Sequence, residues 1–152
     1  MKVENLNTVL FNPLFTSNLI LFFLSGTKNN KIKTELIYLV LPILYNDKLR
    51  VKLSKCKSSS SLKTFLSDDD IQIALLNLSQ QAKDYYKITN TSIITLSNYS
   101  NIQISDFIKI SQKSILNYNF EKDQILREYY KSAYYLGLIF SKEDYKTIFY
   151  KF

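Results

Sequence analysis

The residues that could carry chemistry in this chain are its lysines, arginines and carboxylates, because it contains no histidine and one cysteine, Cys56. Without histidine, neither a Ser-His-Asp nor a Cys-His arrangement can form, and no imidazole titrates near neutral pH. A zinc site of the usual nitrogen and sulfur kind is excluded for the same reason. No GxxxxGK[ST] phosphate loop and no glycine-rich dinucleotide turn occurs. The sequence therefore predicts a protein that is not an enzyme, with no catalytic residues, metal or cofactor.

The carboxylates occur where helix surfaces and helix starts would place them. Glu143 and Asp144 are adjacent in the sequence and have no predicted pocket around them, so we interpret them as solvated. Three aspartates follow Ser67, and the apolar spacing predicts a helix after them. Consecutive residues rarely converge on one metal ion, whereas a helix N-terminus favours negative charge. Capping by Ser67 is therefore the preferred interpretation over a metal site.

The excess positive charge of the chain lies in residues 28–63. This window holds nine basic and two acidic residues, and its net charge of +7 equals the formal net charge of all 152 residues. Such a concentration attracts polyanions such as nucleic acid. We expect a basic loop segment at about 46–63 with a polyanion-facing patch formed by Lys48, Arg50, Lys52, Lys55 and Lys57. A solvated lysine-rich loop is the alternative. Residues 48–53 alternate like a strand, yet Leu49 and Leu53 also lie one helical turn apart, so both structures stay open.

The elements before this window are predicted to be two apolar helices. Asn12 can cap the first helix, with Pro13 in its first turn and Gly26 at its end. Thr34 can cap the second, which Pro42 should kink or divide. The apolar stretches, residues 14–24 and 36–45, are shorter than the roughly 20 residues that span a bilayer. With a single cysteine and no signal-peptide pattern, we expect a cytoplasmic protein that does not enter a membrane.

After the aspartates, apolar residues at steps of three and four predict one helix over residues 71–85. Asn90 can cap a short further helix, and alternation from Ile102 to Ile110 predicts a β-hairpin. Helices followed by a hairpin are the element order of a winged helix. The stretch that would be the recognition helix, residues 91–100, has no lysine or arginine, which counts against reading of the major groove.

The C-terminal residues, about 121–152, predict a helical pair. Apolar residues step by three and four from Leu126 to Phe140, and Ala133 and Gly137 are small enough to permit close approach of another helix. Packing inside the domain and binding of a partner helix are both open. The sequence as a whole predicts a single domain over residues 1–152, mainly α (α+β), compact and winged-helix-like with a small β-hairpin.

Three motifs together resemble a known family. They are Asn12-Pro13 at the head of an apolar helix, Leu39-Val40-Leu41-Pro42-Ile43, and Ala133-x-x-Leu136-Gly137-x-x-Phe140 before Thr147-Ile148. In this order and spacing they resemble the middle component of bacterial three-component ABC systems, a group that includes Lamassu-type defence operons. The tryptophan usual in that family two residues after Leu-Gly is Ile139 here.

The resemblance implies a non-enzymatic accessory subunit in an antiviral or anti-plasmid defence complex. Its partners would be an SMC/Rad50-like ABC ATPase with coiled coils and an effector, often a nuclease, with DNA in the complex. The two apolar stretches look excessive for a lone chain of this length, which favours such a subunit over the alternative, a stand-alone winged-helix DNA-binding regulator. The partner interface is expected at Asn12, Pro13, Phe15, Phe22, Phe23, Ala133, Leu136, Gly137 and Phe140.

Overall fold

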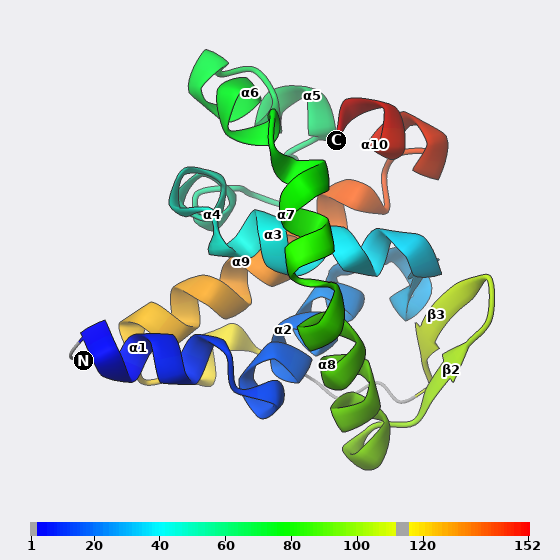
Figure 1. Ribbon diagram of the computed structural model, residues 1–152. Helices are drawn as coiled ribbons and strands as arrows, with labels where there is room; N and C mark the ends of the chain where they lie inside the picture. The colour runs from blue at the N-terminus through cyan, green and yellow to red at the C-terminus, as the bar shows by residue number, and fades with distance from the viewer. Residues whose placement is uncertain (1–2, 112–115) are drawn as a thin grey trace.

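The computed structural model of the chain describes residues 3–111 and 116–152, and its fold is mostly helical (Figure 1). The helices are α1 (Val3–Leu10), α2 (Pro13–Gly26), α3 (Val40–Tyr45), α4 (Asp47–Ser54), α5 (Leu62–Phe65), α6 (Asp69–Leu75), α7 (Leu78–Asp84), α8 (Tyr86–Tyr99), α9 (Gln124–Phe140) and α10 (Tyr145–Lys151). Short 3₁₀ helices are η1 (Lys28–Asn30), η2 (Thr34–Leu39) and η3 (Tyr118–Phe120), and the strands are β1 (Lys31–Lys33), β2 (Ile102–Ile104) and β3 (Phe107–Ile110). The predicted mainly helical α+β class is confirmed.

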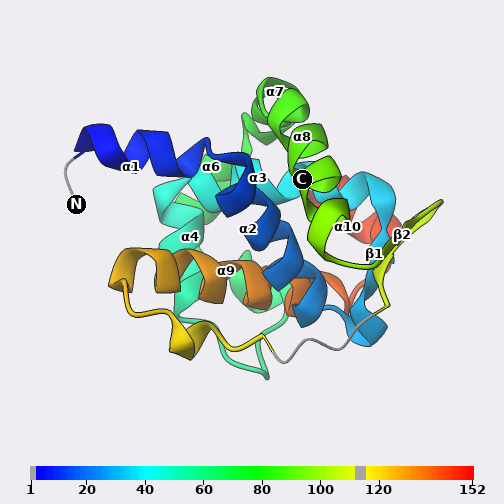
Figure 2. The same cartoon turned by 90° about the horizontal axis from the view of Figure 1, so that it is seen from below.

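Helix α2 forms the centre of the molecule because its sequence is apolar on nearly every side. The Asn12 side chain caps it by accepting a hydrogen bond from the Leu14 amide at 2.8 Å, and Pro13 occupies the first turn, as predicted. The helix packs against both α9 and α8, and Figure 2 shows α2 beside α9. Leu19, Phe23 and Leu24 are fully buried in these contacts.

The crossing of α2 and α9 depends on two glycines that face the opposite backbone. A Cβ atom on Gly137 would lie 1.9 Å from the Phe23 carbonyl oxygen, and one on Gly26 would lie 2.0 Å from the Tyr134 carbonyl oxygen. Neither glycine has a positive φ, so space and not backbone conformation requires them. The predicted close helix crossing at Gly137 is confirmed. Gly26 ends α2, as predicted, and its lack of a side chain also leaves room for the backbone of α9.

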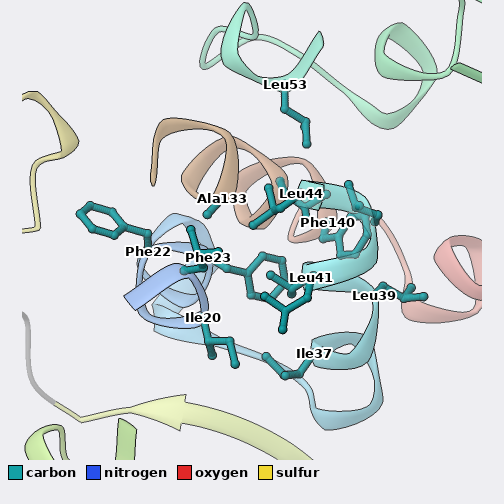
Figure 3. Packing of buried hydrophobic residues seen from close by; sticks show 14 of the residues in the cluster. Ile20, Phe22, Phe23, Ile37, Leu39, Leu41, Leu44, Leu53, Ala133 and Phe140 are labelled. Atoms are coloured by element: carbon teal, nitrogen blue, oxygen red, sulfur yellow. The ribbon is translucent and has the colours of Figure 1, made fainter. Parts of the chain in front are cut away.

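Apart from Leu14, which is exposed, the apolar side chains of residues 14–24 and 36–45 are buried or half-buried in a common core with α9. Figure 3 shows Phe23, Leu41, Leu44 and Phe140 meeting at its centre, and all four are at most 1% exposed. The expectation that these stretches exceed what the chain can bury alone is therefore wrong. Residues 36–45 also divide as Pro42 suggested, into η2 and α3.

The middle of the chain departs from the predicted helices in two places. The helix expected over residues 71–85 is divided into α6 and α7 at Asn77, a residue type that competes with helix for backbone hydrogen bonds. Asp68, not Ser67, is the N-cap residue of α6. Asn90 lies inside α8 and caps nothing. Its side chain accepts a hydrogen bond from the Tyr38 hydroxyl at 2.8 Å, which ties η2 to α8.

The predicted hairpin forms from β2 and β3, and β1 adds a third antiparallel strand in the order β1-β3-β2. Ile32 of β1 pairs with Ile108 of β3, and both are buried. The three residues of β1 were too few to carry a recognisable alternation. The C-terminal pair is α9 and α10, with Asp123 and Asp144 as N-caps whose side chains accept backbone hydrogen bonds.

Candidate functional site

The predicted polyanion patch begins on a helix, not in a loop. Residues 47–54 form α4, because Leu49 and Leu53 both turn into the core and are fully buried. The expectation of a basic loop over residues 46–63 is corrected accordingly: only residues 55–61 connect α4 to α5. Of the two structures left open for residues 48–53, the helix is therefore the one that forms, and it is amphipathic with one narrow buried stripe.

Arg50 of α4 points inward and holds the helix to its neighbours. Its side chain is 12% exposed; Nε donates to Glu128 Oε1 at 2.9 Å, and Nη2 lies 2.7 Å from Asp47 Oδ1. Nη1 also donates to the Leu44 carbonyl oxygen at 3.2 Å, and the guanidinium lies 4.3 Å from the Tyr129 ring centroid. These contacts use most of the donors of the guanidinium group. Arg50 is therefore a structural residue and not part of a polyanion-facing surface.

Two lysines of α4 are paired with the aspartates at the start of α6. Lys52 Nζ donates to Asp68 Oδ2 at 2.5 Å, and Lys48 Nζ lies 3.7 Å from Asp70 Oδ1. The groove between these helices, about 720 Å³ in volume, is lined by charges of both signs around Val51. It is not a field of one sign. Arg50 is excluded from the predicted patch by its inward contacts, whereas a contact of Lys48 and Lys52 with a polyanion stays a prediction.

Lys55 and Lys57 form no ion pair with any residue that the structure describes, and both are exposed. For these two, a contact with a polyanion stays a prediction. The sequence could not show the pairing of α4 with α6, because the paired residues lie 16 or more positions apart. The aspartates were also fully explained by the preference of a helix N-terminus for negative charge.

Replacing Arg50 with methionine should destabilise the chain by about 1–3 kcal/mol, because Glu128 and the Leu44 carbonyl lose a charged donor. Urea unfolding followed by circular dichroism measures the change. Arg50→Lys should restore only part of the loss, since an ammonium cannot replace the planar fork. Lys55→Met, at the exposed residue that follows α4, is the matched control and should change stability by less than about 0.5 kcal/mol. An Arg50→Met chain as stable as the control would show that Arg50 is a surface charge.

The Asp68 carboxylate should make stability depend on acid pH. The hydrogen bond from Lys52 and that from Ser67 lower the pKa of Asp68. A carboxylate whose folded pKa is lowered contributes stability above its unfolded pKa, about 3.9, and loses it as pH falls through the folded pKa. The wild-type chain should therefore have a higher Tm than Asp68→Asn at neutral pH, by a small margin for an exposed pair. Thermal unfolding at about pH 2 should show a smaller margin; a margin equal at both pH values would exclude this ion pair.

The residues expected at a partner interface lie mostly in the core. Phe15, Phe22, Phe23, Ala133, Leu136 and Phe140 are at most 8% exposed, and Gly137 is at the helix crossing. The Phe22 ring stacks on Tyr130 with centroids 4.6 Å apart, and Phe23 meets Phe140 edge to face at 6.0 Å. The partner interpretation of these side chains is corrected to core packing. Asn12 and Pro13 are less buried, and their role is to begin α2.

An exposed apolar groove lies elsewhere, where α5, α6 and α10 gather at the end of the molecule that holds the C-terminus (Figure 1). Two adjoining cavities of about 360 and 440 Å³ share Leu66, Gln72 and Lys151 in their linings. Ile73 and Leu76 line the first cavity and are 60% and 77% exposed. We name this surface the α6–α10 groove; it is lined by Leu62, Lys63, Leu66, Ser67, Gln72, Ile73, Leu75, Leu76, Glu143, Thr147 and Lys151.

Sequence reasoning missed this groove although a signal was present. Ile73 and Leu76 lie off the buried stripe of Ile71, Leu75 and Leu78, so one of the two apolar sets on this segment had to face outward. The positions of α3, α4 and α8, and the division of the segment into two helices, determine which of the two sets faces outward. Neither could be derived from local spacing.

Within residues 3–111 and 116–152, no three acidic or sulfur-bearing side chains are placed to hold one ion. None of the helices described is long and apolar enough to cross a bilayer.

Fold and surfaces together define a small, mostly helical α+β domain with a buried glycine crossing and an exposed apolar groove. The chain belongs to the family of the middle component 3 of ABC-three component (ABC-3C) systems, because the model of that family matches residues 1–152. The family expected from the three motifs is thus confirmed at the level of the ABC-3C middle component. No curated protein and no solved structure matches the chain.

Proposed function

We propose that this chain is a non-enzymatic accessory subunit that joins an SMC/Rad50-like ABC ATPase to an effector protein, often a nuclease, in a defence complex of the Lamassu type. The observation that carries the proposal is the family match over residues 1–152. A middle component belongs to a multi-component assembly, so an ABC ATPase is the expected companion. The complex would act in the cytoplasm, on foreign DNA that engages the ATPase.

The side chains of the chain support a binding role over a catalytic one. Cys56 is buried, and that burial raises the pKa of its thiol, which leaves little nucleophilic thiolate. Burial also raises the pKa of the Tyr129 and Tyr130 hydroxyls. Such hydroxyls are poor acid–base catalysts at neutral pH. The α6–α10 groove, in contrast, offers apolar surface of the kind found at protein interfaces.

A stand-alone winged-helix regulator is the weaker proposal. The helix that precedes the β2–β3 hairpin is α8, and its one basic residue is Lys87 near its start. Base reading in a major groove relies on polar and basic side chains along that helix. The order of elements alone favours a winged helix, and the charges of α8 do not.

Co-expression with the two companion components of its own three-component system tests the proposed function. With an affinity tag on this chain, the ABC ATPase should co-purify in a fixed stoichiometry through size-exclusion chromatography, and the effector should join when all three are present. The tagged ATPase expressed with the effector but without this chain should retain little effector. An effector that binds the ATPase equally well without this chain would contradict a joining role.

A further inference from the structure

The α6–α10 groove has a form that selects the kind of segment it can bind. Its lining comes from α5, α6, α10 and the residues next to them and includes no residue of a strand, so it presents no strand edge for β-addition. Its two adjoining cavities have room for several apolar side chains in a row. A helix that inserts side chains at intervals of three and four residues fits such a surface.

Two apolar residues of the groove, Ile73 and Leu76, are exposed without a structural need for exposure. Ile73 lies in α6 and Leu76 is the residue that follows this helix, and both side chains are more than half exposed, whereas Ile71 and Leu75 are buried. If this surface faced only water, polar residues at positions 73 and 76 would be more favourable, because contact of apolar side chains with water costs free energy. Contact with an apolar face of another molecule removes that area from water.

The charges of the groove are mostly positive and unpaired. Lys63 of α5 and Lys151 of α10 line it, and neither forms an ion pair with any residue in the described part of the chain. Glu143 is the one carboxylate in the lining, at the cavity that α5 and α10 share. A segment that carries carboxylates beside its apolar stripe would find both lysines available.

We propose that the α6–α10 groove binds an amphipathic helix of a companion component, with an apolar stripe that covers Ile73 and Leu76 and with carboxylates that pair with Lys63 and Lys151. This inference rests on the proposed function, because it names the chemistry of the segment through which the subunit is held. The proposal specifies that the bound segment is helical and that its charges are negative.

Reversal of both lysine charges tests the proposal. The probe is the purified companion component that co-purifies with the wild-type chain, and its Kd is measured by isothermal titration calorimetry at two salt concentrations. K63E/K151E should weaken binding at least tenfold at low salt, and the difference should shrink at high salt. K87E/K122E, two exposed lysines outside the groove, is the matched control and should change Kd by less than twofold. Circular dichroism and thermal unfolding should show all variants folded.

The outcomes separate this proposal from the one on which it rests. A wild-type chain that binds while K63E/K151E binds within twofold of it overturns the acidic helix and leaves the joining role standing. If K87E/K122E weakens binding as much as K63E/K151E does, the acidic helix is overturned as well, because the net charge of the chain would then explain both losses of affinity. A wild-type chain that binds neither companion overturns the proposed function itself.

Discussion

Gly137→Ala is expected to cost about 3 kcal/mol or more of the free energy of unfolding, although alanine is the better helix former by about 0.5–1 kcal/mol. The new Cβ would lie 1.9 Å from the Phe23 carbonyl oxygen, and a backbone atom inside a helix cannot rotate away. The axes of α2 and α9 would have to separate, and both helices are packed in the core. Gly137→Leu should prevent folding. Urea unfolding followed by circular dichroism measures the loss.

The second glycine provides an internal check of this mechanism. Gly26→Ala should cost a similar amount, because its Cβ would lie 2.0 Å from the Tyr134 carbonyl oxygen at the same crossing. One separation of the helices relieves both clashes, so the double variant should lose less than the two single losses added together. Gln124→Leu, at the exposed start of α9, is the control for added bulk and should be nearly neutral. A Gly137→Ala chain within about 0.5 kcal/mol of wild type would refute the close crossing.

Ile73→Asp/Leu76→Asp is expected to abolish assembly while leaving the fold intact. Both side chains are more than half exposed, so the free energy of unfolding should change by less than about 1 kcal/mol. Buried apolar anchors at interfaces are commonly worth about 2 kcal/mol each, so losing two predicts a Kd at least a hundredfold weaker. Calorimetric titration against the companion component, together with thermal unfolding of the free variant, measures both quantities.

The matched control for the groove is Ile94→Asp on α8, which replaces an equally exposed isoleucine far from α6 in the sequence. It should leave the Kd within twofold of wild type. Loss of binding in Ile94→Asp with full binding in Ile73→Asp/Leu76→Asp would move the interface from the α6–α10 groove to α8.

Features with short-range causes were predictable from the sequence. The Asn12 cap and Pro13 determine where α2 begins, the alternation after Ile102 determines the hairpin, and the three-four spacing from Leu126 determines α9. Each depends on hydrogen bonds or burial within one or two turns of the chain. The close approach at Gly137 was also predictable, because a small residue on a buried stripe has few other uses.

Features with long-range causes were not predictable. Gly26 meets Tyr134 across more than a hundred residues, and the inward turn of Arg50 depends on Glu128 of α9. A lysine-rich sequence looks the same whether its lysines face solvent or pair with aspartates of the next helix, as Lys52 does with Asp68. The expected interface failed for a related reason. Apolar spacing marks a surface that becomes buried, but it does not distinguish the core of the chain from the surface of a partner.

Amide hydrogen exchange, measured on the free chain and on its complex with the companion components, tests most directly that this subunit is held through the α6–α10 groove. The account predicts that exchange in α6 and α10 slows at least tenfold in the complex, while exchange in α8 stays as it is in the free chain. A complex that forms with unchanged exchange in α6 and α10 would contradict it.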